Sequence, residues 1–166
     1  DDTDNSGILN YLVVKYAGFE IAPDNELNGI TFGGVGSGTT VDYLQVHANA
    51  DDGVEFFGGS VNAKHVVLTS IQDDSIDWDN GFQGKMQYVY VEQDRASGDA
   101  NRGIEADNDG STPDIDPQSN PMIANLTIIG NNFDGEDDSE GVNPVSYTHL
   151  TLPTSQPGEN SGGRRT

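Results

Sequence analysis

The chain has 166 residues, with 28 Asp or Glu against 7 Lys or Arg, so its formal net charge is −21. Binding to nucleic acid or to an anionic membrane surface depends on Lys and Arg, so this charge argues against both partners. The absence of cysteine excludes a disulfide framework and a thiolate metal site. No apolar run approaches the length of a membrane span.

A unit of about 22 residues recurs along the chain. Each copy contains three apolar residues, of which the last two alternate with a polar or outward position as in a β-strand. The copies are Leu9-Leu12-Val14, Val41-Leu44-Val46, Ala63-Val66-Leu68, Met86-Val89-Val91 and Ile123-Leu126-Ile128. Repetition with this period is typical of a solenoid.

A second, shorter strand pattern also recurs, with apolar outer residues and a polar or acidic middle residue in most copies. One face of such a strand is expected in the core and the other in water. The copies are Ile30-Thr31-Phe32, Val54-Glu55-Phe56, Ile76-Asp77-Trp78 and Ile104-Glu105-Ala106. Together the two patterns predict an all-β fold, a right-handed parallel β-helix of about four coils. Leucine-rich repeats share the period but need a Leu- and Asn-rich consensus that is missing.

The spacing of the strands predicts loops after the first and third coils and a third loop from Asp109 to Pro121. Loops on a rigid stack are where function usually lies. Neither end of the repeat supplies a cap, which indicates a fragment of a longer protein.

The segment after Asn143 does not continue the repeat. Residues 145–154, VSYTHLTLPT, resemble the translation of a DNA-sequencing adaptor, which indicates an environmental (metagenomic) sequence. We therefore expect residues 1–143 to form the β-helix and residues 144–166 to be a non-biological tail. A natural flexible tail is the alternative.

The middle positions of the short strands form the main candidate site. If the coils stack in register, Glu55, Asp77 and Glu105 are neighbours at about 4.8 Å, where like charges repel. Further carboxylates flank this row at Asp52, Asp74, Asp79 and Asp107. Three interpretations remain open, namely a hydrated acidic face, a divalent-cation site and a catalytic row.

The loop that begins at Glu105 resembles the calcium loop of EF-hand proteins. Glu105, Asp107, Asp109, Gly110 and Asp116 occupy positions 1, 3, 5, 6 and 12 of that pattern. It departs from the pattern in three ways. Position 1 is Glu where Asp is usual, and position 12 is Asp where Glu is usual. Position 9 is proline, and the flanking segments are not helical. An ordinary Asx-rich turn is therefore the alternative.

The acidic row and this loop lead us to expect calcium as the bound ion. The expected ligands are Asp77, Asp79, Glu105, Asp107, Asp109 and Asp116, and further candidate ligands are Asp52, Glu55 and Asp74.

The aromatic residues divide into two expected groups. Phe32, Phe56 and Trp78 share one apolar column and belong in the core. The better candidates for outward stacking on a sugar are Phe57, Phe82 and Tyr16.

Three segments carry a family resemblance: GVGSGTT at 34–40, DDGVEFFGG at 51–59 and DDSIDWDNG at 73–81. They resemble a group of bacterial surface or lipoprotein β-helices, and the chain is broadly similar to pectate-lyase-like proteins over about residues 6–130. Pectate lyases bind calcium through clustered carboxylates and abstract a proton with Arg or Lys. The resemblance implies Arg102 as the candidate base, with Lys64 and Lys85 as others; Arg102 alternatively offsets the carboxylates.

We therefore expect an exported bacterial β-helix segment, extracellular or on the cell surface, that binds calcium and contacts a polysaccharide or a surface protein. A calcium-dependent lyase acting on uronate polymers and a structural stalk are the alternatives. No lyase signature surrounds an arginine, which counts against the enzyme, and one fold hosts many functions.

Overall fold

The computed structural model describes residues 1–22, 26–93, 102–131 and 141–145, and its strands form two parallel sheets. The first sheet contains the long strands in the order β1 (Ile8–Lys15), β3 (Thr40–His47), β5 (Asn62–Thr69), β7 (Lys85–Glu92) and β9 (Met122–Ile129). The second contains the short strands in the order β10 (Asn143–Pro144), β8 (Ile104–Ala106), β6 (Ile76–Asp79), β4 (Val54–Phe57) and β2 (Ile30–Gly33).

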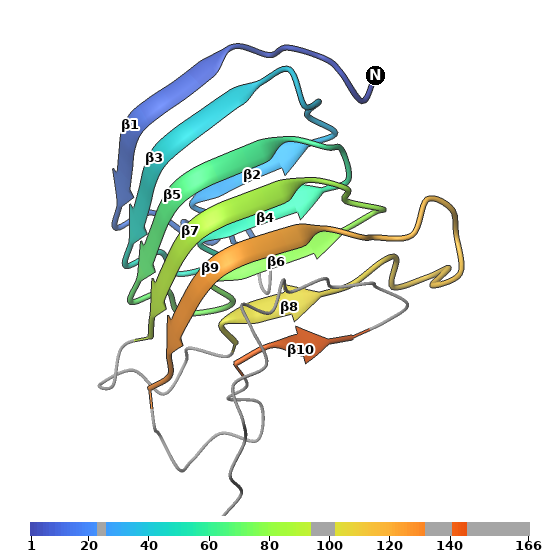
Figure 1. Ribbon diagram of the computed structural model, residues 1–166. Helices are drawn as coiled ribbons and strands as arrows, with labels where there is room; N and C mark the ends of the chain where they lie inside the picture. Colours follow the sequence, from blue (N-terminus) through green and yellow to red (C-terminus); the bar gives the residue numbers. More distant parts are fainter. Residues whose placement is uncertain (23–25, 94–101, 132–140, 146–166) are drawn as a thin grey trace, which may run out of the picture.

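The chain visits the two sheets alternately, so each coil adds one strand to each sheet (Figure 1). This confirms the predicted parallel β-helix. The structure contains one short strand that was not predicted, β10, because it carries no apolar–polar–apolar triplet. In the described part of the chain no helix is long and apolar enough to cross a membrane.

The strand register reproduces the predicted repeat. The middle apolar residues of the long strands are partners in one column: Leu12, Leu44, Val66, Val89 and Leu126. The last apolar residues form a second column: Val14, Val46, Leu68, Val91 and Ile128. Because parallel strands in register place identical positions above one another, the periodic sequence becomes a continuous apolar wall.

Each long strand bends at its fourth residue. Tyr11, Tyr43, His65, Tyr88 and Asn125 have φ between 52° and 61°, in the left-handed region that side chains rarely adopt. The bend inserts one extra residue between inward-facing positions. It explains why the first two apolar residues of each copy are three positions apart instead of two.

The side chains at these bends stack on the outside of the molecule. Ring centroids are 4.6 Å apart for Tyr11 and Tyr43, 4.4 Å for Tyr43 and His65, and 5.0 Å for His65 and Tyr88. His65 Nδ1 also lies 2.7 Å from Asp42 Oδ1. Tyr43 and His65 have a stacked ring on both faces, whereas Tyr11 at the end of the stack is 73% exposed. The stack thus links successive bends and stabilises them.

The core lies between the two sheets, and Phe32, Phe56 and Trp78 are buried in it as predicted. Phe82 was predicted to face outward, and this was wrong, because it has 0% exposure and its ring lies 4.4 Å from that of Phe56. A turn through Asn80 and Gly81, both at positive φ, directs Phe82 inward.

The other two outward predictions are confirmed, since Tyr16 and Phe57 are 76% and 38% exposed.

At the C-terminal end, Pro144 belongs to β10, and the Val145 N–H donates to Ala106 O at 2.8 Å. The stacked strand thus reaches the first residue of the adaptor-like sequence. Residues 146–166 lie outside the described residues, as do 23–25 and 94–101 of the two predicted loops.

Candidate cation site

The predicted acidic row lies on the outer face of the short-strand sheet. Glu55 is the Cα partner of Asp77, and Asp77 is the partner of Glu105. All three side chains are half-buried. The stacking of coils therefore brings these carboxylates together, as their spacing in the sequence predicted.

Three carboxylates converge at one end of this row. Oxygens from Asp52, Glu55 and Asp77 lie within 4.8 Å of one another, and we call these three residues the acidic cluster. A second group with the same spacing contains Asp51, Asp52 and Asp73, so Asp52 is common to both. Calcium binds oxygens at about 2.3–2.6 Å, so two oxygens on opposite sides of one ion are up to about 5 Å apart. The 4.8 Å limit of both groups matches this distance.

Tight packing of the backbone positions Asp52 at the corner before β4. Its Oδ1 accepts a hydrogen bond of 3.1 Å from the Asp74 N–H, and its backbone oxygen accepts one of 2.9 Å from the buried Asn49 side chain. A Cβ at the adjacent Gly53 would lie 2.5 Å from Ser75 O, so this corner requires glycine. The corner holds the carboxylate of Asp52 against the next coil, with 7% of the residue exposed.

The electrostatics of the acidic cluster favour a bound cation or bound protons. Burial, and then the charges of Asp77 and Asp74, raises the pKa of Asp52 to about 10. Burial and the neighbouring Glu55 raise the pKa of Asp77 to about 8, and burial raises that of Glu55 to about 7, although a hydrogen bond from Asn28 opposes this shift. A carboxyl with a raised pKa keeps its proton near neutral pH unless a cation replaces it.

Two adjacent carboxyls share this behaviour. Burial is the main cause in both, and it raises the pKa of Asp74 to about 9 and that of Asp79 to about 6. Their Oδ1 atoms, like that of Asp77, are buried and have no hydrogen-bond partner among the described residues. Asp74 is only 2% exposed. Buried oxygens without a donor are costly, by about 1–3 kcal/mol each. The one on Asp77 belongs to the acidic cluster and is a second indication that a ligand completes it.

Arg102 lies at the opposite end of the row. Its Nη1 is 3.6 Å from Asp74 Oδ2 and 3.3 Å from Glu105 Oε1, and its side chain is 17% exposed. The guanidinium therefore offsets charge on two carboxylates. The other two candidate bases lie elsewhere, since Lys64 is on β5 and Lys85 on β7 of the long-strand sheet.

The loop resembling an EF-hand is built as a turn. Asp109 Oδ1 accepts hydrogen bonds from the N–H groups of Ser111 and Thr112, and Asp107 Oδ1 accepts one from the Asn108 N–H. The Asn108 side chain, which is buried, donates to Pro113 O at 2.7 Å and secures the loop. These hydrogen bonds are typical of an Asx-rich turn, which was the alternative interpretation of this loop.

The structure thus gathers part of the expected ligand set. Asp77 is joined by Asp52 and Glu55, which were further candidates. Among the described residues, the 4.8 Å groups do not include the remaining expected ligands, Asp79, Glu105, Asp107, Asp109 and Asp116, or Asp74. Asp51 and Asp73 were not predicted; the repeated Asp-Asp pair before β4 and β6 was the signal in the sequence.

Comparison with known proteins gives one match. A family model described as a pectate-lyase like beta helix domain matches residues 1–146, which include both sheets and the acidic cluster. No curated protein and no solved structure matches the chain.

Proposed function

The chain belongs to the pectate-lyase-like β-helix family, and from this premise we propose that it is an extracellular domain that binds calcium at the acidic cluster and contacts a polysaccharide or a surface protein. Domains of this family are often extracellular. Because family and fold alone do not define chemistry, the proposal rests on one observation: carboxylate oxygens of Asp52, Glu55 and Asp77 lie within 4.8 Å.

Calcium fits this set of ligands better than other common ions. Calcium takes six to eight oxygens in flexible geometry, and three carboxylates can supply up to about six, with water completing the shell. Magnesium demands a near-ideal octahedron at shorter distances and keeps several of its waters. Zinc favours His and Cys ligands, and the cluster contains neither.

Calcium binding would reverse the electrostatic cost of the cluster. Without an ion, Glu55 and Asp77 repel each other or retain protons, whereas a divalent cation turns the same oxygens into ligands. The corner that places Asp52 exists only in the stacked coils, so the ion binds the folded state. Such an ion stabilises the fold by about 2.7 kcal/mol at a hundredfold excess over Kd.

A binding role has more support than a lyase role. The expected base, Arg102, is engaged by two carboxylates, and a guanidinium in that environment holds its proton. Proton abstraction requires a deprotonated group within reach of the substrate. A structural stalk, the other alternative, gives no reason for buried carboxyl oxygens without hydrogen-bond donors.

The test is calcium binding by the full chain, measured by titration calorimetry and by thermal unfolding with calcium, magnesium or a chelator. We expect calcium to bind and to raise the unfolding temperature more than magnesium does. Equal shifts for the two ions, or no heat of calcium binding, would contradict the proposal.

A further inference from the structure

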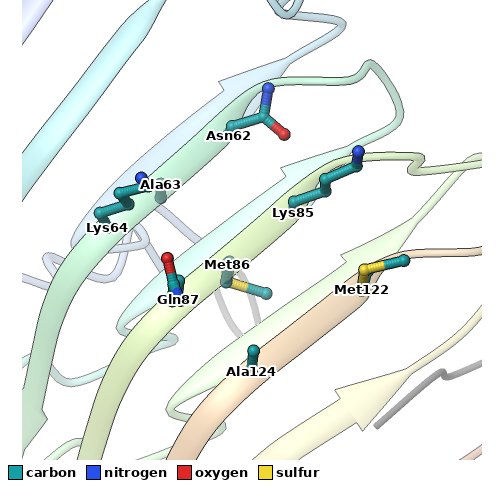
Figure 2. A pocket seen from close by; sticks show the side chains of 8 residues that line it. All are labelled: Asn62, Ala63, Lys64, Lys85, Met86, Gln87, Met122 and Ala124. Atoms are coloured by element: carbon teal, nitrogen blue, oxygen red, sulfur yellow. The ribbon is translucent and has the colours of Figure 1, made fainter. Parts of the chain in front are cut away.

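A groove on the outer face of the long-strand sheet differs in charge from the rest of the molecule. It has a volume of about 460 Å³ and crosses β5, β7 and β9 (Figure 2). Its outward-facing lining residues are Asn62, Lys64, Lys85, Gln87, Met122 and Ala124. This volume lies in the range typical of small-molecule sites, roughly 300–1,000 Å³.

The groove concentrates positive charge in a chain whose net charge is −21. Two of its lining residues are lysines and none is acidic. Lys64 pairs with Gln87, and Asn62 pairs with Lys85, so the lysines are diagonal neighbours on adjacent strands. Both are exposed, and the ion pairs found within the described ranges involve His65 and Arg102 instead.

Recognition in this groove must come from side chains. Strands β5 and β7 are hydrogen-bonded on both sides, so neither offers a free edge to which a peptide could add as a strand. The side chains supply two ammonium groups and two amides, and Gln87 is held by a hydrogen bond of 3.3 Å to Asn125. Met122 and Ala124 give the groove an apolar side.

The groove continues along the axis of the stack. A smaller hollow of about 280 Å³ is lined by Thr40 and Asp42 of β3 and shares Asn62 and Lys64 with the first. The combined groove therefore runs across four neighbouring strands of the sheet. Because Asp42 lies at the β3 end, an anionic group fits best between the two lysines on β5 and β7.

We propose that this groove binds an anionic saccharide, in which a sugar carboxylate or sulfate group lies between Lys64 and Lys85. The ammonium groups donate charge-assisted hydrogen bonds to the anion, and the amides of Asn62 and Gln87 bond the sugar hydroxyls. The apolar side formed by Met122 and Ala124 contacts the C–H face of a ring.

This inference deepens the polysaccharide-binding part of the proposed function and rests on it, but its site and ligand are separate from those of calcium. The overall negative charge repels a polyanion at long range. At about 0.15 M salt that repulsion is screened beyond about 8 Å, whereas the groove acts at hydrogen-bond distance.

The test is titration calorimetry of the full chain with trigalacturonate, a sulfated trisaccharide and fully methyl-esterified trigalacturonate, each in calcium and in EDTA. We expect at least one of the two anionic probes to bind in EDTA and the neutral ester to bind at least tenfold more weakly. The double variant Lys64→Gln with Lys85→Gln should lose at least tenfold in affinity. The matching Lys→Arg double variant should retain binding.

Lys15→Glu is the control for net charge, because it makes the net charge more negative by two, as the double Lys→Gln variant does, and Lys15 is an exposed lysine of β1 outside the groove. The saccharide affinity of this control should stay within twofold of that of the unmodified chain. Unchanged binding by the Lys→Gln double variant, equal binding of the ester, or tighter binding of a Glu-rich peptide would overturn the groove site. Binding that requires calcium and ignores both lysines would place the saccharide at the acidic cluster, leaving the proposed function intact. Failure of both anionic probes to bind would overturn the inference. The calcium part of the proposed function is tested separately, by the calcium-induced rise in unfolding temperature.

Discussion

Glu55 and Asp77 are Cα partners on adjacent parallel strands, and both side chains stand on the same outer face. Neither can move away without breaking the register that also aligns Phe56 with Trp78 in the core. Burial and then the charge of Asp79 raise the pKa of Glu55 to about 7, although hydrogen bonds from Asn28 and Asp77 oppose this shift. Burial and then the charges of Glu55 and Glu105 raise the pKa of Asp77 to about 8. The fold therefore imposes an electrostatic cost that depends on pH and on bound cations.

Without a divalent cation, the free energy of unfolding should fall as the pH rises. The folded-state pKa values of Glu55, Asp77 and Asp52, about 7, 8 and 10, lie above the ordinary values of 4.5, 3.8 and 3.8. Between the ordinary and the raised pKa, the folded state holds more protons than the unfolded state, so stability decreases. Urea unfolding in EDTA at pH 5, 7 and 9 measures this effect, and a flat or rising profile from pH 5 to 9 would count against the buried cluster.

Calcium binding should release protons at pH 6. At that pH Asp52 and Asp77, with pKa values of about 10 and 8, hold protons in the absence of an ion, and carboxylate ligands must give them up. Calorimetric titration in two buffers of different ionisation enthalpy gives the number of protons released. We expect at least one proton per calcium and tighter binding at pH 8; a heat independent of buffer would exclude the coupling.

Asp77→Asn and Asp109→Asn separate the acidic cluster from the loop resembling an EF-hand. Each variant replaces a carboxyl group with a neutral amide of the same shape, and the asparagine oxygen at 109 can still accept the hydrogen bonds from Ser111 and Thr112. We expect Asp77→Asn to lose most of the calcium-induced rise in unfolding temperature and Asp109→Asn to retain it. The reverse result would assign calcium to the loop instead.

Gly53→Ala should destabilise the corner that presents Asp52. An added Cβ would lie 2.5 Å from Ser75 O, a backbone atom that cannot move without displacing the next coil. Overpacking of this kind costs about 1–3 kcal/mol of unfolding free energy. Gly110→Ala is the matched control, because nothing lies within 4 Å of its Cβ, and it should change stability by less than about 0.5 kcal/mol in the same urea experiment.

The sequence predicts those features that the apolar period dictates. Register follows from the recurring triplets, so the column of Phe32, Phe56 and Trp78 and the row of Glu55 and Asp77 could be placed before the structure was known. The apolar period alone could not predict the acidic cluster, because the position of Asp52 next to Glu55 and Asp77 depends on the shape of the corner before β4. A periodic pattern specifies which residues share a column, but it does not specify how turns fold between columns.

Local backbone conformation explains the remaining differences. Phe82 follows a turn at positive φ that reverses its direction, and no apolar period reports such a turn. The outer stack of Tyr11, Tyr43, His65 and Tyr88 was missed for a related reason. Its members share only their place at the bend, and none of them is glycine, the residue that normally indicates positive φ.

Two substitutions at His65 isolate the backbone cost of the bend from the loss of the ring stack. His65→Asn and His65→Val both remove the ring that stacks on Tyr43 and Tyr88, so both should lose stacking energy of about 0.5–1.5 kcal/mol per aromatic pair. They differ at the backbone, where φ is 52°. Asparagine tolerates the left-handed region, as Asn125 does in the same column, whereas a β-branched residue is strained there. We therefore expect the free energy of unfolding of His65→Val, measured in urea, to be about 1–2 kcal/mol lower than that of His65→Asn. Equal stabilities would show that the left-handed backbone conformation at this position carries no cost for a β-branched residue, and would contradict the prediction.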